Sequence, residues 1–194
     1  MLDADIREPL FLYLETRYGK VRIFEEKNIG TSRADVIAIT DGELIGLEIK
    51  SDGDSYARLK SQIRNYNKYC GKNYLVVGAS HRIHAGEHIP DFWGILVVSR
   101  DPDTKRPRIE ESRAAQPNPG CDIKRQLSLL WRNELANLLR KNRLPKYNGK
   151  SKAFICEKLA SGLCLETLLR QLTDEIFERD YTCLLYTSPS PRDA

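Results

Sequence analysis

RADVIAITDGELIGLEIK, residues 33–50, contains two apolar runs on either side of an Asp-Gly pair. Asp-Gly is a strong signal for a two-residue β-hairpin turn, because glycine readily adopts the positive φ that such a turn requires. The flanking runs are short and rich in Val, Ile and Leu, which is typical of strands. We therefore expect residues 36–39 and 44–49 to form neighbouring antiparallel strands.

Around this hairpin the sequence alternates between helical and strand-like patterns. Apolar residues at helical spacing predict helices at residues 5–18 and 54–70, the second capped by Asp54. Short apolar runs predict further strands at residues 21–26, 74–77 and 93–98. An antiparallel meander followed by a helical crossover to a fully apolar strand predicts an α/β fold, with a mixed β-sheet flanked by helices.

A domain boundary is expected near residue 118. Residues 100–120 are rich in proline and charge, a composition typical of hairpins and linkers. We therefore assign residues 1–118 to an α/β domain and residues 119–182 to a basic helical extension. Periodicity predicts helices at 123–139, 151–160 and 165–179. Residues 183–194 lack periodicity, and we expect a disordered tail that is not native to the protein.

The composition predicts a cytoplasmic protein without a membrane partner. The longest apolar runs fall far short of the ~18 residues of a membrane span, and acidic residues interrupt the segment that a secretion signal would need. The five cysteines lack a C-x-x-C pair, which predicts buried, reduced thiols rather than disulfides, a zinc knuckle or an iron–sulfur cluster. The oligomeric state stays open, a homodimer included.

Positive charge is concentrated in the second half of the chain. Residues 1–100 hold 14 basic and 14 acidic side chains, whereas residues 121–160 hold ten basic against three acidic ones. Such a surplus favours a polyanionic partner, here DNA, over a merely solubilising role. The residues that we expect to contact phosphates lie in the acid-free segment 140–152 and are Arg143, Lys146, Lys150 and Lys152.

Three residues of the opening stretch can form a catalytic site. Glu48 and Lys50 alternate onto one face of their strand, about 7 Å apart, and Asp35 can lie opposite them on the paired strand. The two carboxylates and the carbonyl oxygen of Ile49 make an all-oxygen site that suits Mg²⁺, with Mn²⁺ as its substitute. The Lys50 ammonium can orient an attacking water or stabilise charge on a phosphorane. The set predicts phosphodiester hydrolysis, and the alternative is that these charges face water on an edge strand.

At these residues the chain resembles the PD-(D/E)XK nuclease superfamily, whose pattern is a strand Asp followed by Glu-x-Lys on the next strand. Ala34 stands where that pattern usually has proline. Gln62 and Tyr66 match the Q-x-x-x-Y feature of its RecB-like branch, although Tyr66 also lies on the apolar stripe of its helix, where packing is the alternative role. The resemblance implies a restriction-endonuclease-like core and a Mg²⁺-dependent deoxyribonuclease with Asp35, Glu48, Lys50, Gln62 and Tyr66 in its site.

Residues 6–98 as a whole are similar to a family of uncharacterised bacterial predicted nucleases, on the fragments IREPL (6–10), EIKSD (48–52) and IPDFWG (89–94). The superfamily usually adds an acid from its first helix or first strand. Glu8 is the preferred candidate, with Glu25 and Glu26 as alternatives. The basic segment and its flanking leucines resemble a SAP-type DNA-binding motif, which implies contacts to phosphates rather than to bases.

The sequence leaves several alternatives open. A nucleic-acid-binding module that kept the fold and lost turnover is the rival, and a missing third acid would favour it. RNA is an alternative substrate, because the predicted site handles the phosphate and not the sugar. DNA repair and defence against foreign DNA are both compatible with these features. His81, His84 and His88 match no zinc spacing and predict a solvated loop or helix face.

Overall fold

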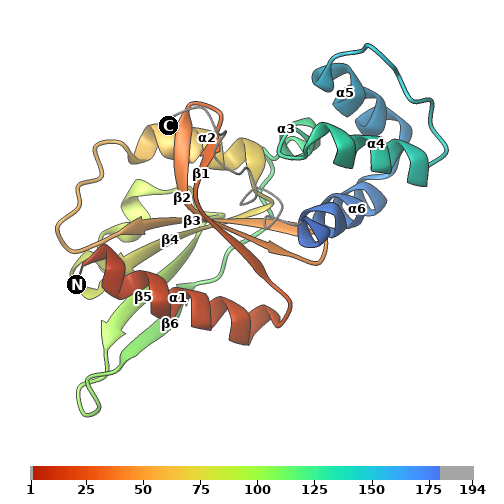
Figure 1. The fold of residues 1–194 in the computed structure, drawn as a ribbon. Helices are drawn as coiled ribbons and strands as arrows, with labels where there is room; N and C mark the ends of the chain where they lie inside the picture. The colour runs from red at the N-terminus through yellow and green to blue at the C-terminus, as the bar shows by residue number, and fades with distance from the viewer. Residues whose placement is uncertain (1, 180–194) are drawn as a thin grey trace, which may run out of the picture.

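The computed structural model describes residues 2–179 and contains one six-stranded sheet with helices on both faces (Figure 1). The strands are β1 (Arg22–Ile29), β2 (Ser32–Thr40), β3 (Glu43–Lys50), β4 (Lys72–Gly78), β5 (Gly94–Arg100) and β6 (Pro107–Arg113). The helices are α1 (Asp3–Tyr18), α2 (Leu59–Tyr69), α3 (Ile123–Leu127), α4 (Arg132–Lys141), α5 (Lys152–Gly162) and α6 (Leu165–Glu178), with two short 3-10 helices, η1 (Ala79–His81) and η2 (Ala85–His88). The predicted α/β fold is confirmed.

The strands lie across the sheet in sequence order. β1, β2 and β3 form an antiparallel meander, β3, β4 and β5 run parallel, and β6 returns antiparallel to β5. The β2–β3 connection is the expected two-residue turn, because Thr40 pairs with Glu43 and Gly42 has a φ of 73°. α2 supplies the crossover that the parallel pair β3–β4 requires.

Strand alternation divides the apolar side chains between two cores. On one face, Val36 and Leu47 pack beneath α1, whose Ile6 belongs to the same cluster. On the opposite face, which we call the α2 face, Ile37 packs in a cluster with Tyr66 of α2 and with the C-terminal helices. In Figure 1, α1 and α2 accordingly lie on opposite sides of the sheet.

Gly46 allows α2 to lie close against β3. A Cβ at this position would clash with the Tyr66 ring and would crowd the side chains of Cys70 and Asn73. Glycine at position 46, two residues before Glu48, therefore allows the Tyr66 ring to lie against β3.

α2 begins later than predicted. The helix starts at Leu59 rather than near residue 54. The Asp54 carboxylate does not cap it, because that carboxylate accepts hydrogen bonds from the backbone N–H and the hydroxyl of Ser51, at 2.8 and 2.7 Å. Asp54 therefore closes a turn directly after β3, and residues 51–58 form a loop beside the end of that strand.

Two further elements differ from the sequence prediction. The helix expected at 123–139 is divided into α3 and α4, because Glu134 accepts a hydrogen bond from the backbone N–H of Trp131 and starts a new helix there. Part of residues 100–120, which were expected to form a hairpin and linker, forms β6, which pairs antiparallel with β5 along its length. The hairpin is thus present, but the length of the strand was not predicted, since most of its residues are charged and one of its faces is exposed.

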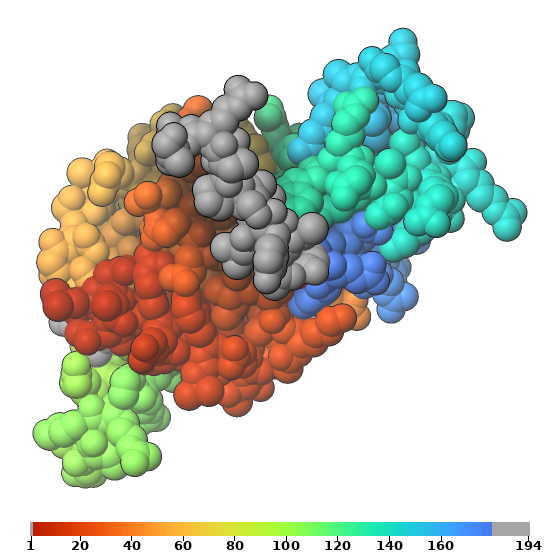
Figure 2. Space-filling model, in the orientation of Figure 1, coloured from red at the N-terminus to blue at the C-terminus, as the bar shows by residue number. Residues whose placement is uncertain are grey.

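The helical extension, α3 to α6, is anchored on the sheet (Figures 1 and 2). Leucines of α4, α5 and α6 belong to the core cluster of the α2 face. The backbone N–H of Gly42 donates to the Thr173 hydroxyl at 3.0 Å, and the Arg22 guanidinium donates to the carbonyl oxygens of Ile176 and Phe177 at 2.8 Å. A division into separately folding domains at residue 118 stays a prediction.

The expectation of buried thiols is only partly met. Cys70 and Cys156 are buried and Cys121 is partly so, but Cys164 is exposed, with its Sγ 2.9 Å from the Thr167 hydroxyl. Cys183 and the predicted tail, residues 183–194, lie outside the described residues. Among residues 2–179, no helix is both long and apolar enough to span a bilayer.

Candidate active site

Asp35 and Glu48 lie next to each other where β2 and β3 begin to separate. The paired register ends at Val36 and Leu47, and Asp35 and Glu48 are the next residue on each strand. Directly opposed residues of antiparallel strands share a face. Asp35 also joins the two strands, because its Oδ2 accepts a hydrogen bond from the backbone N–H of Ile49 at 2.8 Å.

Lys50 completes the group from the same strand as Glu48. Its Nζ lies 2.6 Å from Glu48 Oε1, and the two side chains are almost fully buried. The second oxygen, Glu48 Oε2, is buried and has no hydrogen-bond partner within residues 2–179. Three residues chosen from the sequence thus lie together at the end of the hairpin, and their chemical roles stay predictions.

The pKa values of both carboxylates are raised, chiefly by burial. Burial raises the pKa of Glu48 to about 7, the Asp35 charge adds to this, and Lys50 and Tyr66 oppose it. Burial also raises the pKa of Asp35, and Glu26 adds to this, while the Ile49 N–H and Lys50 oppose the rise. Anionic side chains held at such a cost favour a nearby cation.

Tyr66 lies beneath the site. It is fully buried, its hydroxyl donates to the carbonyl oxygen of Leu47 at 3.0 Å, and the same hydroxyl accepts from the backbone N–H of Asp35 at 3.0 Å. Its ring meets Trp93 edge-on, with centroids 5.6 Å apart. In this position Tyr66 joins β2 to β3 under Asp35, and its side chain does not reach the surface.

A polar cavity of about 280 Å³ opens beside Asp35 and contains the other predicted helix residue, Gln62. The cavity is lined by Thr31, Ser32 and Arg33 from the β1–β2 hairpin, Asp35, and Arg58, Ser61 and Gln62 around the start of α2. Gln62 Oε1 is buried, and no described residue bonds to it. The sequence prediction missed Arg33, although it stands two residues before Asp35 on the same strand, and it also missed Arg58.

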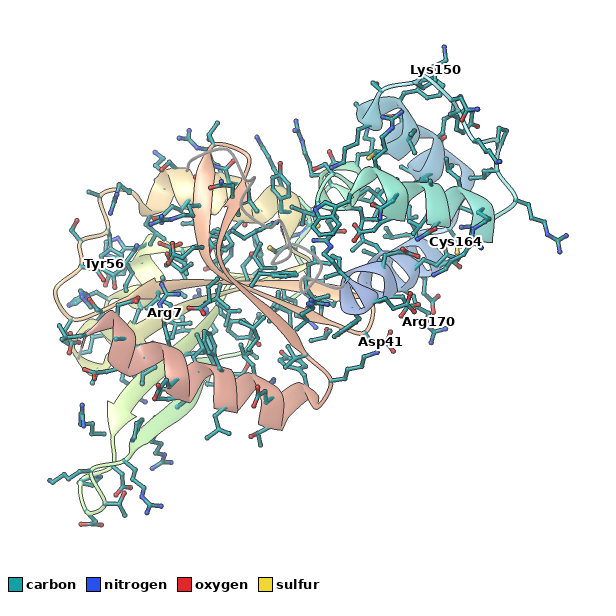
Figure 3. The ribbon with its side chains drawn as sticks, in the orientation of Figure 1. Arg7, Asp41, Tyr56, Lys150, Cys164 and Arg170 are labelled. Carbon is teal, nitrogen blue, oxygen red and sulfur yellow. The ribbon has the colours of Figure 1, made fainter. Side chains whose placement is uncertain are left out.

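Arg7 of α1 is a third residue that the sequence prediction missed. Its guanidinium makes ion pairs with Glu25 at 3.0 Å and Glu26 at 2.7 Å, and donates to the backbone carbonyl of Asp35 at 3.4 Å. Figure 3 labels Arg7 at the N-terminal part of α1, over the sheet. The sequence does contain a signal for these ion pairs, because the predicted first helix carries an arginine and the predicted first strand carries two adjacent glutamates.

Of the three candidates for a further acid, Glu26 is the one with an electrostatic effect on Asp35. It stands opposite Asp35, between the pairs that Glu25 and Lys27 make with β2. Its backbone adopts a φ of 52°, which is uncommon for a residue with a side chain. Its carboxylate is held by Arg7 and, at 2.6 Å, by Arg33.

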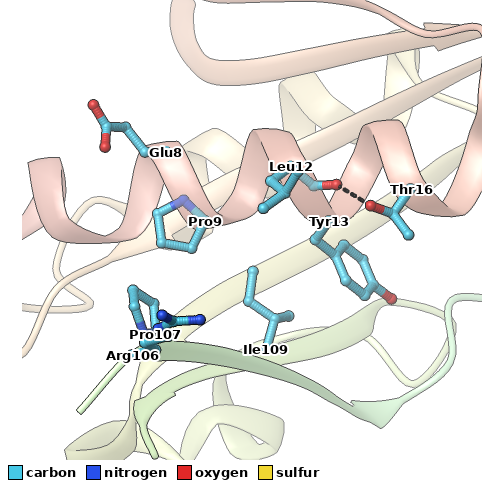
Figure 4. A pocket seen from close by; sticks show the side chains of 8 residues that line it. All are labelled: Glu8, Pro9, Leu12, Tyr13, Thr16, Arg106, Pro107 and Ile109. Carbon is cyan, nitrogen blue, oxygen red and sulfur yellow. Dashed lines mark hydrogen bonds between the residues drawn. The ribbon is translucent and has the colours of Figure 1, made fainter. Parts of the chain in front are cut away.

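Glu8, the preferred candidate, is exposed at a different place. It borders a groove of about 510 Å³ between α1 and β6, together with Leu12, Tyr13 and Ile109. Figure 4 shows its carboxylate turned away from the strand. Within the described part of the chain, no three Asp, Glu, His or Cys side chains converge as a metal-binding group. A third acid therefore stays a prediction.

Tyr56 connects the loop after β3 with the histidines. Its ring stacks on His88 at 3.9 Å and meets His81 edge-on at 5.2 Å. His84 instead contacts Glu87 at 2.9 Å on the surface. The three histidines thus divide between an aromatic cluster and an exposed turn.

The predicted phosphate contacts lie on the loop from α4 to α5, except for Lys152, which is the first residue of α5. Arg143, Lys146 and Lys150 are exposed, whereas Lys152 is half-buried and donates to the carbonyl oxygen of Ser128 at 2.7 Å. Figure 3 places Lys150 at the outer end of the helical extension, well away from Arg7. The basic loop and the acidic group are therefore separate surfaces.

Comparisons with known proteins give a family but no activity. A solved structure of SfsA from Pyrococcus furiosus in complex with Ca²⁺ is similar over 61% of this chain and 61% of SfsA, with 17% identity and a TM-score of 0.31. A likeness of that degree carries no argument about this chain. No curated protein matches its sequence. The family described as "Bacteriophage P4 protein cII" matches residues 5–185, which include both the sheet and the helical extension, and the chain belongs to that family.

Proposed function

We propose that this protein is a Mg²⁺-dependent deoxyribonuclease of the PD-(D/E)XK type. The observation that carries the proposal is the juxtaposition of Asp35, Glu48 and Lys50 at the end of the β2–β3 hairpin. Glu48 is fully buried, paired on one oxygen with Lys50, and without a partner on the other among the described residues. A buried carboxylate oxygen in this condition is costly unless a ligand satisfies it.

The donor atoms suit a hard divalent cation. Asp35 has one oxygen occupied by the Ile49 N–H and one remaining, and Glu48 contributes its unpartnered oxygen. The backbone carbonyl of Ile49 is the third candidate ligand. Oxygen-only donor sets favour Mg²⁺ or Mn²⁺ over zinc. When bound, such a cation would neutralise phosphate charge and lower the pKa of a coordinated water.

The protein side chains would divide the remaining work. Lys50 holds a positive charge beside the carboxylates, where it can orient a water and stabilise negative charge as the phosphorus–oxygen bond breaks. Tyr66 and the Ile49 N–H fix Asp35 from below and from the side. Arg7 fixes the neighbouring strand through Glu25 and Glu26. The positioned groups can thus meet a phosphate without rearranging.

The test is cleavage by the purified full chain. Supercoiled, linear and single-stranded DNA, and a single-stranded RNA, are incubated with Mg²⁺, with Mn²⁺ or with EDTA, and products are separated by gel electrophoresis. We expect metal-dependent cleavage of DNA. Comparing supercoiled with linear DNA distinguishes nicking within a strand from digestion at its ends. Comparing DNA with RNA identifies the substrate class.

One observation favours the rival, a nucleic-acid-binding module without turnover. No third acid joins Asp35 and Glu48 as a metal-binding group among residues 2–179. The rival predicts DNA binding that is unchanged by EDTA and no cleavage with either metal. Cleavage that requires Mg²⁺ and is lost in Asp35→Asn would exclude it.

A further inference from the structure

The cavity beside Asp35 has the composition of an anion site. Two arginines from different parts of the chain, Arg33 before Asp35 and Arg58 before α2, line it. The hydroxyls of Thr31 and Ser32 accept from the Asn65 amide, so their own protons can serve as further donors. Guanidinium groups and hydroxyls are the side chains that bind phosphate oxygens. A volume of about 280 Å³ corresponds to roughly nine waters, which is room for a phosphate group and its sugar.

The two arginines are not equivalent. Arg33 is held at 2.6 Å by Glu26, which fixes its direction. Arg58 is exposed and makes no ion pair or hydrogen bond through its side chain with any residue from 2 to 179. An arginine at the mouth of a polar cavity, with its charge unneutralised by the described chain, favours an external anion.

Gln62 adds an independent observation inside the same cavity. Its Oε1 is buried and unpartnered among the described residues, and a buried acceptor of this kind costs free energy until a donor reaches it. A sugar hydroxyl or a base N–H would be such a donor. The cavity thus presents cations for a phosphate beside a buried acceptor that lacks a donor among the described residues.

We propose that this cavity, between Arg33 and Arg58, binds the phosphate next to the scissile one in the same nucleic acid strand, with its nucleoside against Gln62. The proposal rests on the proposed nuclease function and deepens it. Asp35 lines both the cavity and the acidic group, so a strand that enters the cavity passes the carboxylates at its next linkage. The preferred substrate is therefore a strand that continues at least one nucleotide beyond the cut, and a bond at the very end on that side is a poor substrate.

The experiment measures binding, so that it does not depend on turnover. Short single-stranded oligonucleotides carry one neutral methylphosphonate, moved one linkage at a time, and their affinities for the metal-free full chain are measured by fluorescence anisotropy. The variants are Arg58→Ala and, as matched control, Arg64→Ala, an exposed arginine on the same helix that does not line the cavity. Both positions are exposed, so neither change should unfold the protein.

We expect one methylphosphonate position to weaken wild-type binding roughly ten- to a hundredfold, the range of a lost charged hydrogen bond. That position should have little further effect in Arg58→Ala, while Arg64→Ala behaves as wild type. Independent, multiplicative losses in Arg58→Ala would overturn the proposal, as would equal losses in both variants or the absence of measurable oligonucleotide binding. If the binding result holds while the wild type cleaves nothing with Mg²⁺ or Mn²⁺, the cavity assignment stands and the nuclease assignment fails.

Discussion

Glu48 carries a charge that the folded chain holds at a cost. Its neighbours supply only one full counter-charge, Lys50, while Asp35 opposes ionisation. Most structural carboxylates have pKa values lowered by their partners, and a raised one is characteristic of functional sites. Two effects can therefore be measured separately: the pH dependence of stability, which reports on Glu48, and the effect of removing the Asp35 charge on cleavage.

The metal-free protein should lose stability as the pH rises from about 4.5 to about 7. Glu48 has an ordinary pKa of 4.5 and a folded-state pKa of about 7. The folded state thus binds the proton more tightly than the unfolded state, and the free energy of unfolding falls as the pH rises through this window and is level above it. The shift sets an upper limit of about 3 kcal/mol. Chemical unfolding in EDTA measures this slope, and Glu48→Gln should flatten it. An unchanged slope in that variant would show that Glu48 titrates normally.

Asp35→Asn should separate cleavage from binding. The amide oxygen can still accept the Ile49 N–H, so the fold is kept, but the ligand charge is lost. We expect the cleavage rate to fall at least ~100-fold, while DNA affinity stays equal or rises because a repelling charge has gone. The control is Asp41→Asn, an exposed aspartate in the β2–β3 turn, which should cleave normally. Parallel loss of binding and cleavage in Asp35→Asn would argue against a catalytic role.

Tyr66 joins three elements, because a residue of α2 bonds to the backbones of both β2 and β3. Gly46 provides the space for its ring. The spacing of apolar residues predicted that Tyr66 lies on the apolar stripe of its helix, but it did not predict the hydrogen bonds of its hydroxyl to Asp35 and Leu47. Side-chain bonds to backbone groups of distant strands depend on the register and on the helix–sheet separation, which no local pattern encodes.

Tyr66→Phe should cost about 1–3 kcal/mol in the free energy of unfolding, since it leaves the buried Asp35 N–H and Leu47 carbonyl without this partner. It should also slow cleavage, because Asp35 loses its support. Tyr69→Phe is the control: Tyr69 is buried on the same helix, and its hydroxyl bonds to no residue in the described range. Urea unfolding and cleavage rates measure both effects. Equal stabilities and equal cleavage rates in the two variants would show that Tyr66 contributes only packing.

β1 to β5 were predictable from sequence because short apolar runs and one Asp-Gly turn are local signals. The grouping of Asp35, Glu48 and Lys50 followed from them. The start of α2 was not predictable from sequence, because Asp54 could cap a helix or close the turn at Ser51. Which of the two forms depends on how the loop packs against η1 and η2. Which candidate acid lies near Asp35 was not predictable either, because the place of Glu8 depends on how α1 crosses the sheet, while Glu26 lies on β1 opposite Asp35.

At the scale of the whole molecule, Lys150 of the basic loop lies far from Arg7 (Figure 3), which bonds to the backbone carbonyl of Asp35 in the acidic group. A long nucleic acid could touch both surfaces, whereas a short one would occupy one at a time. Affinity and chemistry are then divided between the extension and the sheet.

Replacing Lys146 and Lys150 together with Ala should therefore weaken binding to a long duplex and leave binding to a strand of about four nucleotides unchanged. Each lost phosphate contact should lower the slope of log affinity against log salt by about 0.9 on duplex DNA. Lys152 is left in place because its ammonium holds Ser128. Anisotropy titrations across a salt series measure the slope. A loss of cleavage at saturating DNA with normal affinity would place the basic loop in the active site instead.

The anchoring of α6 on the sheet has a consequence for synthesis on the ribosome. Ile37 and Ile39 emerge early, yet Leu168, Leu172 and Ile176 of α6, which complete their cluster, are translated more than a hundred residues later. Until then α2 covers only part of this apolar sheet face, and exposed apolar surface on a nascent chain is a condition in which chaperone capture and aggregation compete with folding. A ribosome stalled within α5 would thus carry a chain with its acidic group already translated and its core still open, so the last helices determine when the protein can leave its chaperones.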